Sequence, residues 1–171
     1  MAFLEKHLVV KKSSIPGSGK GLFTKVFIPK DTRVVEYKGR ITKWSEVKND
    51  SENGYMYTIN RSYVIDARPF TKALGRYAND ARGLVRVKGL TNNCIYLTEG
   101  TKAFIESVKD IPAGAEILVD YGKEYWDVIR QNLKIDREKK KKEAKKAVLK
   151  KKEPKKSVPK KKKKGVVRLR R

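Results

Sequence analysis

Short apolar runs separated by glycine, proline and polar turns dominate the first 126 residues of the chain. Runs of this length that are rich in β-branched and aromatic residues and bounded by turn residues are typical of β-strands. The strands are expected at residues 7–12, 22–28, 32–41, 55–59, 63–66, 94–98, 101–108 and 117–120. This pattern predicts a compact, mainly β domain.

Helical spacing is confined to short segments and to the end of this domain. Trp126, Ile129 and Leu133 recur every three or four residues, which predicts a helix that begins near Glu124. Thr42 is a suitable N-cap for a shorter helix. The short helical segments are expected at residues 42–50 and 70–75. Turns are expected at the glycine-rich residues 13–21, at 29–31, at 60–62 within a hairpin, and at 99–100.

Charge divides the 171-residue chain into two parts. The net charge is +24, and residues 135–171 hold 20 Lys and Arg against 4 Asp and Glu, whereas residues 1–134 hold 23 against 15. A lysine-rich segment punctuated by proline cannot bury a core and is expected to be largely disordered, at least beyond about residue 152. The sequence therefore predicts a domain at residues 1–134 and a basic tail at residues 135–171.

The basic tail is suited to polyanions, because lysines displace the counterions of a phosphate backbone without reading its sequence. DNA, RNA and an anionic membrane surface all fit, and such clusters can also be a nuclear import signal or a solubilising tail. Lysine blocks that alternate with Pro, Ala, Ser and Val favour contact with nucleic acid or chromatin through residues 135–171.

Cysteine and histidine are scarce. Cys94 and His7 are the single cysteine and the single histidine, so an intramolecular disulfide, a cysteine-rich zinc site and a histidine-based metal cluster or acid–base pair are excluded. No apolar run approaches membrane-spanning length, and the N-terminus lacks the apolar core of a signal peptide. We expect no metal, no membrane insertion, and an intracellular location in a nucleus, a bacterial nucleoid or the cytoplasm, or a host nucleus for an effector.

Several polar and aromatic clusters could carry chemistry, but each is weak alone. Tyr121 ends an apolar run, a glycine follows it, and Tyr125 and Trp126 come directly after. Taken alone, this pattern is that of a strand that ends on a core tyrosine. The glycine-rich residues 17–21 are neither a P-loop nor a dinucleotide fingerprint, because the required spacing and the following helix are absent.

The order of these clusters along the chain resembles the SET-domain protein-lysine methyltransferase family over roughly residues 8–126. Residues 19–23 match its G-x-G motif, 36–39 its E-Y-x-G motif, 64–67 a V-I-D-A-like strand, 76–79 with 93–94 its R-F-I-N-H-S…P-N-C motif, and 111–122 its I-x-x-G-E-E-L-x-x-D-Y-G motif. Residues 54–57 and 74–76 look most like the branch that monomethylates lysine 20 of histone H4. The compact build and the end of the domain look more like small viral and bacterial members.

The resemblance implies a β-rich, β-clip-like fold with a pseudoknot, in which the segment around Asn79 passes through a loop closed by the last strand. It also implies S-adenosylmethionine as the methyl donor. The cofactor-binding residues carried over from the family are Gly19, Lys20, Gly21, Tyr55, Asn79, Asp80, Tyr121 and Trp126. The residues of the substrate lysine channel are Tyr37, Tyr55, Tyr57 and Val119, and the catalytic residue is Tyr121.

The chemistry of methyl transfer fits such a site. The attacking lysine must be neutral, although its free pKa is about 10.4. A dry aromatic channel beside a positively charged sulfur disfavours the ammonium form and lowers that pKa. In-line attack needs positioning and desolvation rather than a metal. Tyr121 could act as a general base or as an orienting dipole.

Two departures from the family pattern change these expectations. Asp80-Ala81 stands where the family has His-Ser, and the stretch between Asn79 and Asn93 is longer than usual, which makes a cofactor contact at Asp80 less secure than one at Asn79. Val119 stands where the family uses Tyr or Phe to limit how many methyl groups fit. The smaller side chain predicts that dimethylation or trimethylation is possible.

The sequence favours a methyltransferase acting on histone-like or other basic DNA-associated proteins, its own tail included. Two other functions remain open. One is a non-catalytic nucleic-acid-binding protein with a degenerate scaffold, and the other is a membrane-surface protein.

Overall fold

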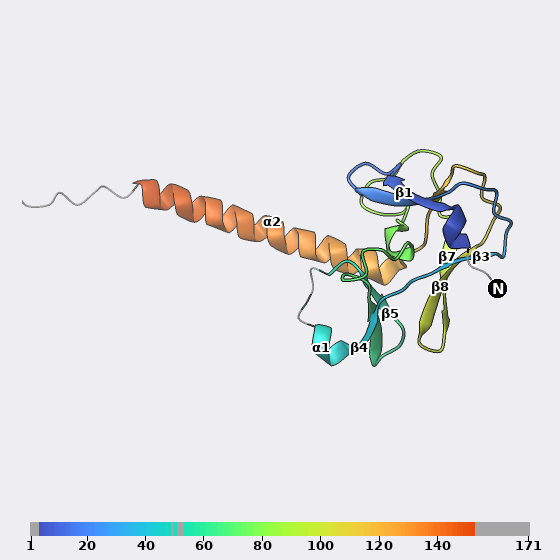
Figure 1. The fold of residues 1–171 in the computed structure, drawn as a ribbon. Helices are drawn as coiled ribbons and strands as arrows, with labels where there is room; N and C mark the ends of the chain where they lie inside the picture. The colour runs from blue at the N-terminus through green and yellow to red at the C-terminus, as the bar shows by residue number, and fades with distance from the viewer. Residues whose placement is uncertain (1–3, 49, 51–52, 153–171) are drawn as a thin grey trace, which may run out of the picture. The chain divides into compact units, whose positions relative to one another are not determined.

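Three small antiparallel sheets form the first unit of the chain. The structure is a computed structural model that describes residues 4–48, 50 and 53–152, with side chains described up to residue 145. The chain forms two compact units, Met1–Trp126 and Asp127–Arg171, and the first contains every strand found among the described residues. Within that unit, Figure 1 shows β1 at one end and β4 and β5 with the short helix α1 at the other. The mainly β class predicted from the sequence is confirmed.

The first sheet brings the start of the domain beside its end. It has the order β1-β2-β9, with bounds β1 Leu8–Lys12, β2 Lys20–Thr24 and β9 Glu116–Ile117, and the short 3-10 helix η1 Leu4–His7 precedes it. Leu22 of β2 pairs with Ile117 of β9, and both side chains are fully buried. β2 thus begins at Lys20, two residues before the expected start at residue 22, and the glycine-rich turn expected at residues 13–21 ends at Gly19.

The second sheet has the order β3-β8-β7, with bounds β3 Arg33–Glu36, β7 Cys94–Glu99 and β8 Lys102–Ser107. Glu99 pairs with Lys102, so the two-residue turn is Gly100-Thr101 rather than the predicted Glu99-Gly100. Gly100 has a φ of 61°, which a glycine adopts without steric cost. The expected hairpin is therefore present, one residue further along the chain.

The third sheet has the order β4-β6-β5, with bounds β4 Arg40–Lys43, β5 Met56–Thr58 and β6 Tyr63–Asp66. β5 and β6 form the predicted hairpin, with Thr58 opposite Val64. The helices in this part of the chain are α1 Trp44–Val47 and the 3-10 helix η2 Gly75–Tyr77. The helical turn expected at residues 70–75 thus starts only at Gly75.

The prediction of one strand at residues 32–41 is wrong, because the chain forms β3 and β4 there in two different sheets. Gly39 lies in the break between them. A Cβ at this position would lie 2.5 Å from Ile65 Cγ2 and 2.6 Å from the Asp66 carbonyl oxygen, so the backbone passes too close to β6 for any side chain. Thr42 is also not a helix cap: it lies in β4, and its hydroxyl donates to Glu46 Oε2 at 2.5 Å.

Residues 118–119 connect two segments that are distant in sequence. Asn79 forms a parallel bridge with Leu118, and Cys94 forms one with Val119. The Val119 N–H donates to the Asn79 carbonyl at 2.8 Å, and the Cys94 N–H donates to the Leu118 carbonyl at 2.9 Å. Of the strand predicted at 117–120, only Ile117 belongs to β9, and the bridges at residues 118–119 follow it. This segment holds the residues around Asn79 against the end of the domain.

The C-terminal helix α2 spans Lys123–Lys152 and begins one residue before the predicted start at Glu124. Residues 135–152 of the segment expected to be disordered belong to this helix, because residues 135–150 contain no proline and hold many good helix formers. Residues 153–171, where the tail was predicted to be disordered, lie outside the described residues. No helix among the described residues is long and apolar enough to cross a membrane.

Candidate active site

Three tyrosines from three strands or strand ends meet at the centre of the candidate site. The ring centroids of Tyr57 and Tyr96 lie 4.8 Å apart, those of Tyr37 and Tyr96 lie 5.6 Å apart, and those of Tyr37 and Tyr57 lie 5.9 Å apart. Separations of this size are typical of interacting aromatic pairs. Tyr37 follows β3, whereas Tyr57 lies in β5 and Tyr96 in β7, so this group joins the second and third sheets.

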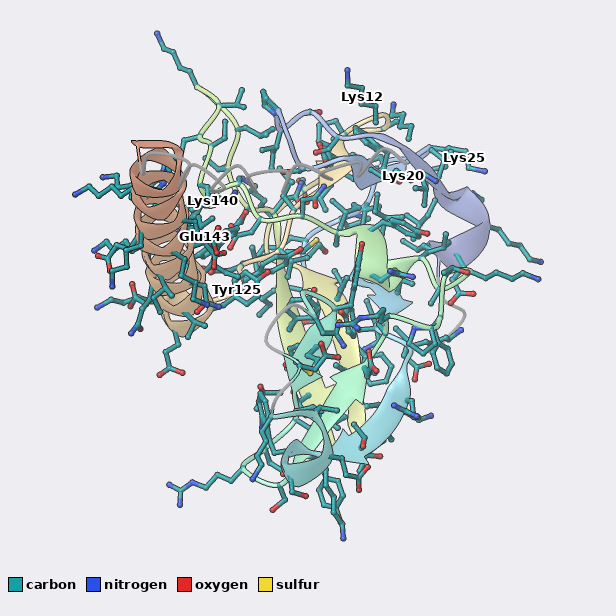
Figure 2. The ribbon with its side chains drawn as sticks, turned by 90° about the vertical axis from the view of Figure 1, so that its left-hand side faces the viewer. Lys12, Lys20, Lys25, Tyr125, Lys140 and Glu143 are labelled. Carbon is teal, nitrogen blue, oxygen red and sulfur yellow. The ribbon has the colours of Figure 1, made fainter. Side chains whose placement is uncertain are left out.

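The aromatic group continues to the start of α2. Tyr96 stacks on Tyr121 at 6.4 Å, and Tyr121 stacks on Trp126 at 5.9 Å with an interplanar angle of 11°. Tyr125 makes edge contacts with both Tyr121 and Trp126, at 5.0 Å and 5.1 Å. Figure 2 shows Tyr125 at the first turn of α2. Six rings thus form one continuous aromatic cluster, made of Tyr37, Tyr57, Tyr96, Tyr121, Tyr125 and Trp126.

Tyr121 lies in the middle of the aromatic cluster and is fixed at both its backbone and its hydroxyl. Its hydroxyl donates to the Ala78 carbonyl at 2.6 Å, and its N–H donates to Asp80 Oδ2 at 2.9 Å. Burial raises the pKa of Tyr121 well above its usual range, and the neighbouring Tyr125 adds to the effect. The Tyr121 side chain is therefore a neutral phenol at physiological pH.

Burial raises the pKa of Tyr37 and Tyr96 in the same direction, although Arg76 lowers the pKa of Tyr37 in part. The Tyr37 hydroxyl donates to the Tyr55 carbonyl at 3.0 Å, and the Tyr57 hydroxyl lies 2.8 Å from Thr98 Oγ1. The raised pKa values keep Tyr37, Tyr96 and Tyr121 uncharged, and fixed partners hold the hydroxyls of Tyr37, Tyr57 and Tyr121.

Glu116 and Asn79 join the glycine-rich segment to the rest of the site. The Asn79 side-chain amide donates to the Lys20 carbonyl at 3.0 Å and to Glu116 Oε1 at 3.2 Å. The same carboxylate accepts hydrogen bonds from the Ser13 hydroxyl and the Ser14 N–H, both at 2.7 Å. Gly21 lies under it, because a Cβ there would be 2.1 Å from Glu116 Oε1. The segment before β2 is thereby fastened to β9 and to Asn79.

The Asp80 carboxylate accepts hydrogen bonds from four protein groups, among them Trp126 Nε1 at 2.7 Å. Its side chain is buried. A carboxylate has about four acceptor sites, so the acceptor capacity of Asp80 is filled by the protein itself. No oxygen of the Asp80 carboxylate is therefore left free to accept a hydrogen bond from the cofactor.

The remaining predicted site residues lie at the edge of the aromatic cluster. Tyr55 stacks under the Arg76 guanidinium, whose carbon is 3.9 Å from the ring centroid, and its carbonyl receives the Tyr37 hydroxyl. Val119 is fully buried in the main hydrophobic core, and Tyr96 and Tyr121 pack against that core. Lys20 is exposed, and Figure 2 shows it with Lys12 and Lys25 around the β1–β2 end of the first unit.

Sequence reasoning missed Tyr96, Tyr125 and Glu116 as parts of the site. In the sequence, Tyr125 stands beside Trp126, and Glu116 lies within the motif at residues 111–122. Tyr96 lies in β7, which pairs with β8, and β8 also pairs with β3 next to Tyr37, so the order of strands in the sheet brings Tyr96 to the site and no local sequence signal marks it. Within the described part of the chain, no group of three or more His, Cys, Asp or Glu side chains is placed to hold a metal ion.

Residues 19–122 match the SET domain family. The chain belongs to the SET-domain family. Over 139 residues it is 31% identical to the histone-lysine N-methyltransferase set-1 of Caenorhabditis elegans, an alignment that covers 75% of this chain and 55% of that protein. It is 32% identical over 126 residues to the N-lysine methyltransferase KMT5A-A of Xenopus laevis, covering 66% of this chain and 36% of that protein. The chain thus spans about half or less of the length of these curated relatives.

A solved structure shares the fold of this SET domain. It is a humanized mutant of the Chaetomium thermophilum Polycomb Repressive Complex 2 bound to the inhibitor GSK126, with a TM-score of 0.56 and 25% sequence identity. The likeness covers 72% of this chain and 16% of that chain. The resemblance and the SET fold expected from the sequence are confirmed.

Proposed function

We propose that this SET-domain protein is an S-adenosylmethionine-dependent protein-lysine N-methyltransferase, with the aromatic cluster as its lysine channel and Tyr121 as its catalytic residue. The observation that carries the proposal is the position of Tyr121. Its ring lies between Tyr96 and Trp126, and its hydroxyl is directed at the Ala78 carbonyl. The curated relatives, which are named as lysine methyltransferases, support the same reaction class.

The glycine-rich segment and Asn79 fit the cofactor expected for this reaction. Gly19 has a φ of 67°, and no heavy atom lies within 4 Å of where its Cβ would be, so the backbone there is open to a ligand. The Asn79 side chain ties this segment to Glu116. The residues that would hold S-adenosylmethionine are Gly19, Lys20, Gly21, Tyr55, Asn79, Tyr121 and Trp126. When bound, S-adenosylmethionine supplies a methyl group attached to a positively charged sulfur.

The aromatic cluster prepares the substrate lysine for attack. Uncharged rings around the amine disfavour its ammonium form and so lower its pKa, while the ring faces tolerate the methylated cation that forms. Tyr37, Tyr57 and Tyr96 supply most of these rings, and Tyr55 lies at their edge. None of the six rings of the cluster can accept a proton near neutral pH. The lysine therefore loses its proton to solvent before transfer.

Tyr121 acts as an orienting group in this scheme. Its raised pKa keeps the hydroxyl protonated, and a neutral phenol is a poor general base near neutral pH. The hydroxyl hydrogen is given to the Ala78 carbonyl, so the oxygen lone pairs remain free to accept an N–H from the lysine amine. This hydrogen bond would turn the nitrogen lone pair toward the methyl group. Positioning of this kind is a major source of rate enhancement.

The proposed substrates are histones or other basic, DNA-associated proteins in a nucleus or nucleoid. The names of the relatives point to histone or other protein lysines, and residues 135–171 are suited to bind the nucleic acid that accompanies such substrates. The lysines of the tail are a second set of targets, because a tether raises their effective concentration. With Val119 two residues before Tyr121, we expect dimethylated or trimethylated product.

Calorimetry with S-adenosylmethionine, followed by transfer of labelled methyl groups to core histones, tests this function. Binding and transfer together support the methyltransferase. Nucleic-acid binding without S-adenosylmethionine binding would instead support the non-catalytic scaffold. Liposome binding that depends on the tail and that DNA does not compete away would support the membrane-surface protein.

A further inference from the structure

Asp80 occupies a central position between the start of α2, the end of the last strand and the long loop at residues 81–92. Its Oδ2 accepts hydrogen bonds from the Tyr121 N–H at 2.9 Å and from Trp126 Nε1 at 2.7 Å. Its Oδ1 accepts hydrogen bonds from the Arg82 N–H at 2.7 Å and from the Asn92 side-chain amide at 2.8 Å. Each carboxylate oxygen thus holds two donors, and the residue is only 4% exposed.

The two donors on Oδ2 belong to the aromatic cluster. One is the backbone of Tyr121 and the other is the indole of Trp126, and the two rings stack at 5.9 Å. The carboxylate therefore sets where both rings lie relative to each other. Hydrogen bonds to a charged, buried acceptor are among the strongest that proteins make.

The two donors on Oδ1 come from the base of the loop. Asn92 also accepts the Ala81 N–H on its own Oδ1 at 2.8 Å, so Asp80 and Asn92 together hold the two ends of the loop at residues 81–92. Gly83 in this loop contacts the Trp126 ring, because a Cβ there would lie 2.8 Å from Cη2. The loop at residues 81–92 thus packs against the Trp126 indole through Gly83.

We propose that Asp80 is a positioning residue that fixes Trp126 and the Tyr121 backbone in place, so that this end of the site is shaped before a ligand binds. This role replaces the direct cofactor contact suggested by the resemblance, since no acceptor site of the carboxylate remains free. The proposal rests on the proposed methyl-transfer function only for its kinetic consequences, not for its structural claim.

The Asp80→Asn variant tests whether the Asp80 carboxylate fixes Trp126 and the Tyr121 backbone in place. An asparagine has one acceptor oxygen and one NH2 group, so whichever way it turns, two N–H donors face an NH2 group and lose their acceptor. We expect the Trp126 indole N–H in the full-length protein to exchange with solvent about tenfold faster or more, as measured by NMR of the 15N-labelled indoles. The indole of Trp44, in α1, serves as the internal reference, and Asp136→Asn on the exposed face of α2 serves as the matched control.

The double variant Asp80→Asn with Asn92→Asp distinguishes loss of the specific hydrogen bonds of Asp80 from general destabilisation of the domain. In this exchange, the amide oxygen at position 80 can accept from Tyr121 and Trp126, while its NH2 group donates to the new carboxylate at position 92. That carboxylate also accepts the Ala81 N–H, so only the Arg82 N–H is left without its acceptor. We expect the double variant to regain most of the Trp126 protection that Asp80→Asn loses.

Steady-state kinetics test the effect of Asp80 on the proposed reaction. With S-adenosylmethionine and a protein substrate, we expect Asp80→Asn to raise the KM for S-adenosylmethionine about tenfold, and the double variant to reverse most of that rise. Gly83→Ala is a second variant that displaces the indole without changing the Asp80 side chain, although its Cβ would also lie 3.3 Å from the Asp80 carbonyl oxygen. It should shift the Trp126 resonance and raise the same KM.

Unchanged Trp126 exchange in Asp80→Asn would overturn the proposal, and so would failure of a folded double variant to restore protection. A Gly83→Ala variant whose Trp126 resonance does not move would also contradict it. Absence of methyl transfer by the wild-type protein would overturn the proposed function but leave the indole measurements decisive for Asp80.

Discussion

Substitution of Gly21 by alanine is expected to break the connection between the glycine-rich segment and the rest of the SET domain. The new Cβ would lie 2.1 Å from Glu116 Oε1, 2.8 Å from Glu116 Cδ and 3.2 Å from Phe23 Cε2. Because real Cβ contacts of 2.1 Å do not occur, the Glu116 carboxylate must leave its position.

The energetic cost follows from the hydrogen bonds that Glu116 would lose. Oε1 accepts the Ser13 hydroxyl and the Asn79 amide, and Oε2 accepts the Ser14 N–H. Hydrogen bonds to a charged group contribute about 1.5–3 kcal/mol each, so losing two of the three costs about 3–6 kcal/mol. For a chain of this size, at about 2–4 °C per kcal/mol, that corresponds to a fall in Tm of roughly 6–24 °C.

Thermal unfolding of the single and double variants measures this coupling. The double variant Gly21→Ala with Glu116→Ala removes the clash with Glu116 and keeps only the 3.2 Å approach to Phe23 Cε2, so its free energy of unfolding should equal that of Glu116→Ala within about 1 kcal/mol. Gly54→Ala is the matched control, because its nearest heavy atom, Tyr125 Oη, lies 3.8 Å away and the expected change is about 0.5 kcal/mol or less. Additive costs of the two substitutions would refute the reasoning, as would a Gly21→Ala variant as stable as wild type.

The remaining predictions concern the chemistry of the site. Tyr121→Phe keeps the ring between Tyr96 and Trp126 but removes the hydroxyl, so methyl transfer should fall at least about 100-fold while S-adenosylmethionine binding persists, as kinetics and calorimetry can show; full activity would remove Tyr121 from the mechanism. Burial raises the folded-state pKa of Tyr37, Tyr96 and Tyr121, whereas unfolded tyrosines ionise near pH 10. The stability from these groups is therefore complete below about pH 9 and is lost as the pH rises above about 10, so Tm should hold steady to pH 9 and then decline; a Tm that is flat to pH 11 would argue against it. Mass spectrometry after long incubation should find dimethylated or trimethylated lysine because Val119 is small, and monomethylated product alone would count against that reasoning.

The strand pattern was predictable because it depends on local features. Alternating apolar runs and turn residues placed β1, the β5–β6 hairpin and the β7–β8 hairpin to within one or two residues. The break between β3 and β4 was not predictable in this way, since Gly39 is required by the close approach of β6 rather than by anything in residues 32–41. Contacts between distant segments decide such positions.

The aromatic cluster was likewise predictable in part from the sequence. The order of motifs identified Tyr37, Tyr57, Tyr121 and Trp126, which the structure brings into one group of rings. Tyr96 completes that group, but its neighbours come from other strands, so the sequence near it gives no sign of the role.

Asp80 shows how a motif can leave the partners of a side chain undetermined. The resemblance assigned it to the cofactor by its place after Asn79, whereas the structure fills its acceptors with protein donors that are up to 46 residues away. Which atoms reach a carboxylate depends on the tertiary fold, and the motif alone does not contain that information.

Methyl transfer itself is the most direct test of the account. The full-length protein would be incubated with isotopically labelled S-adenosylmethionine and core histones, and both proteins would then be analysed by mass spectrometry with site mapping. The account predicts labelled methyl groups on specific lysines of a histone or of residues 135–171, and their loss in Tyr121→Phe. Wild-type protein that transfers no methyl group to either substrate, or that transfers it equally well as Tyr121→Phe, would contradict the account.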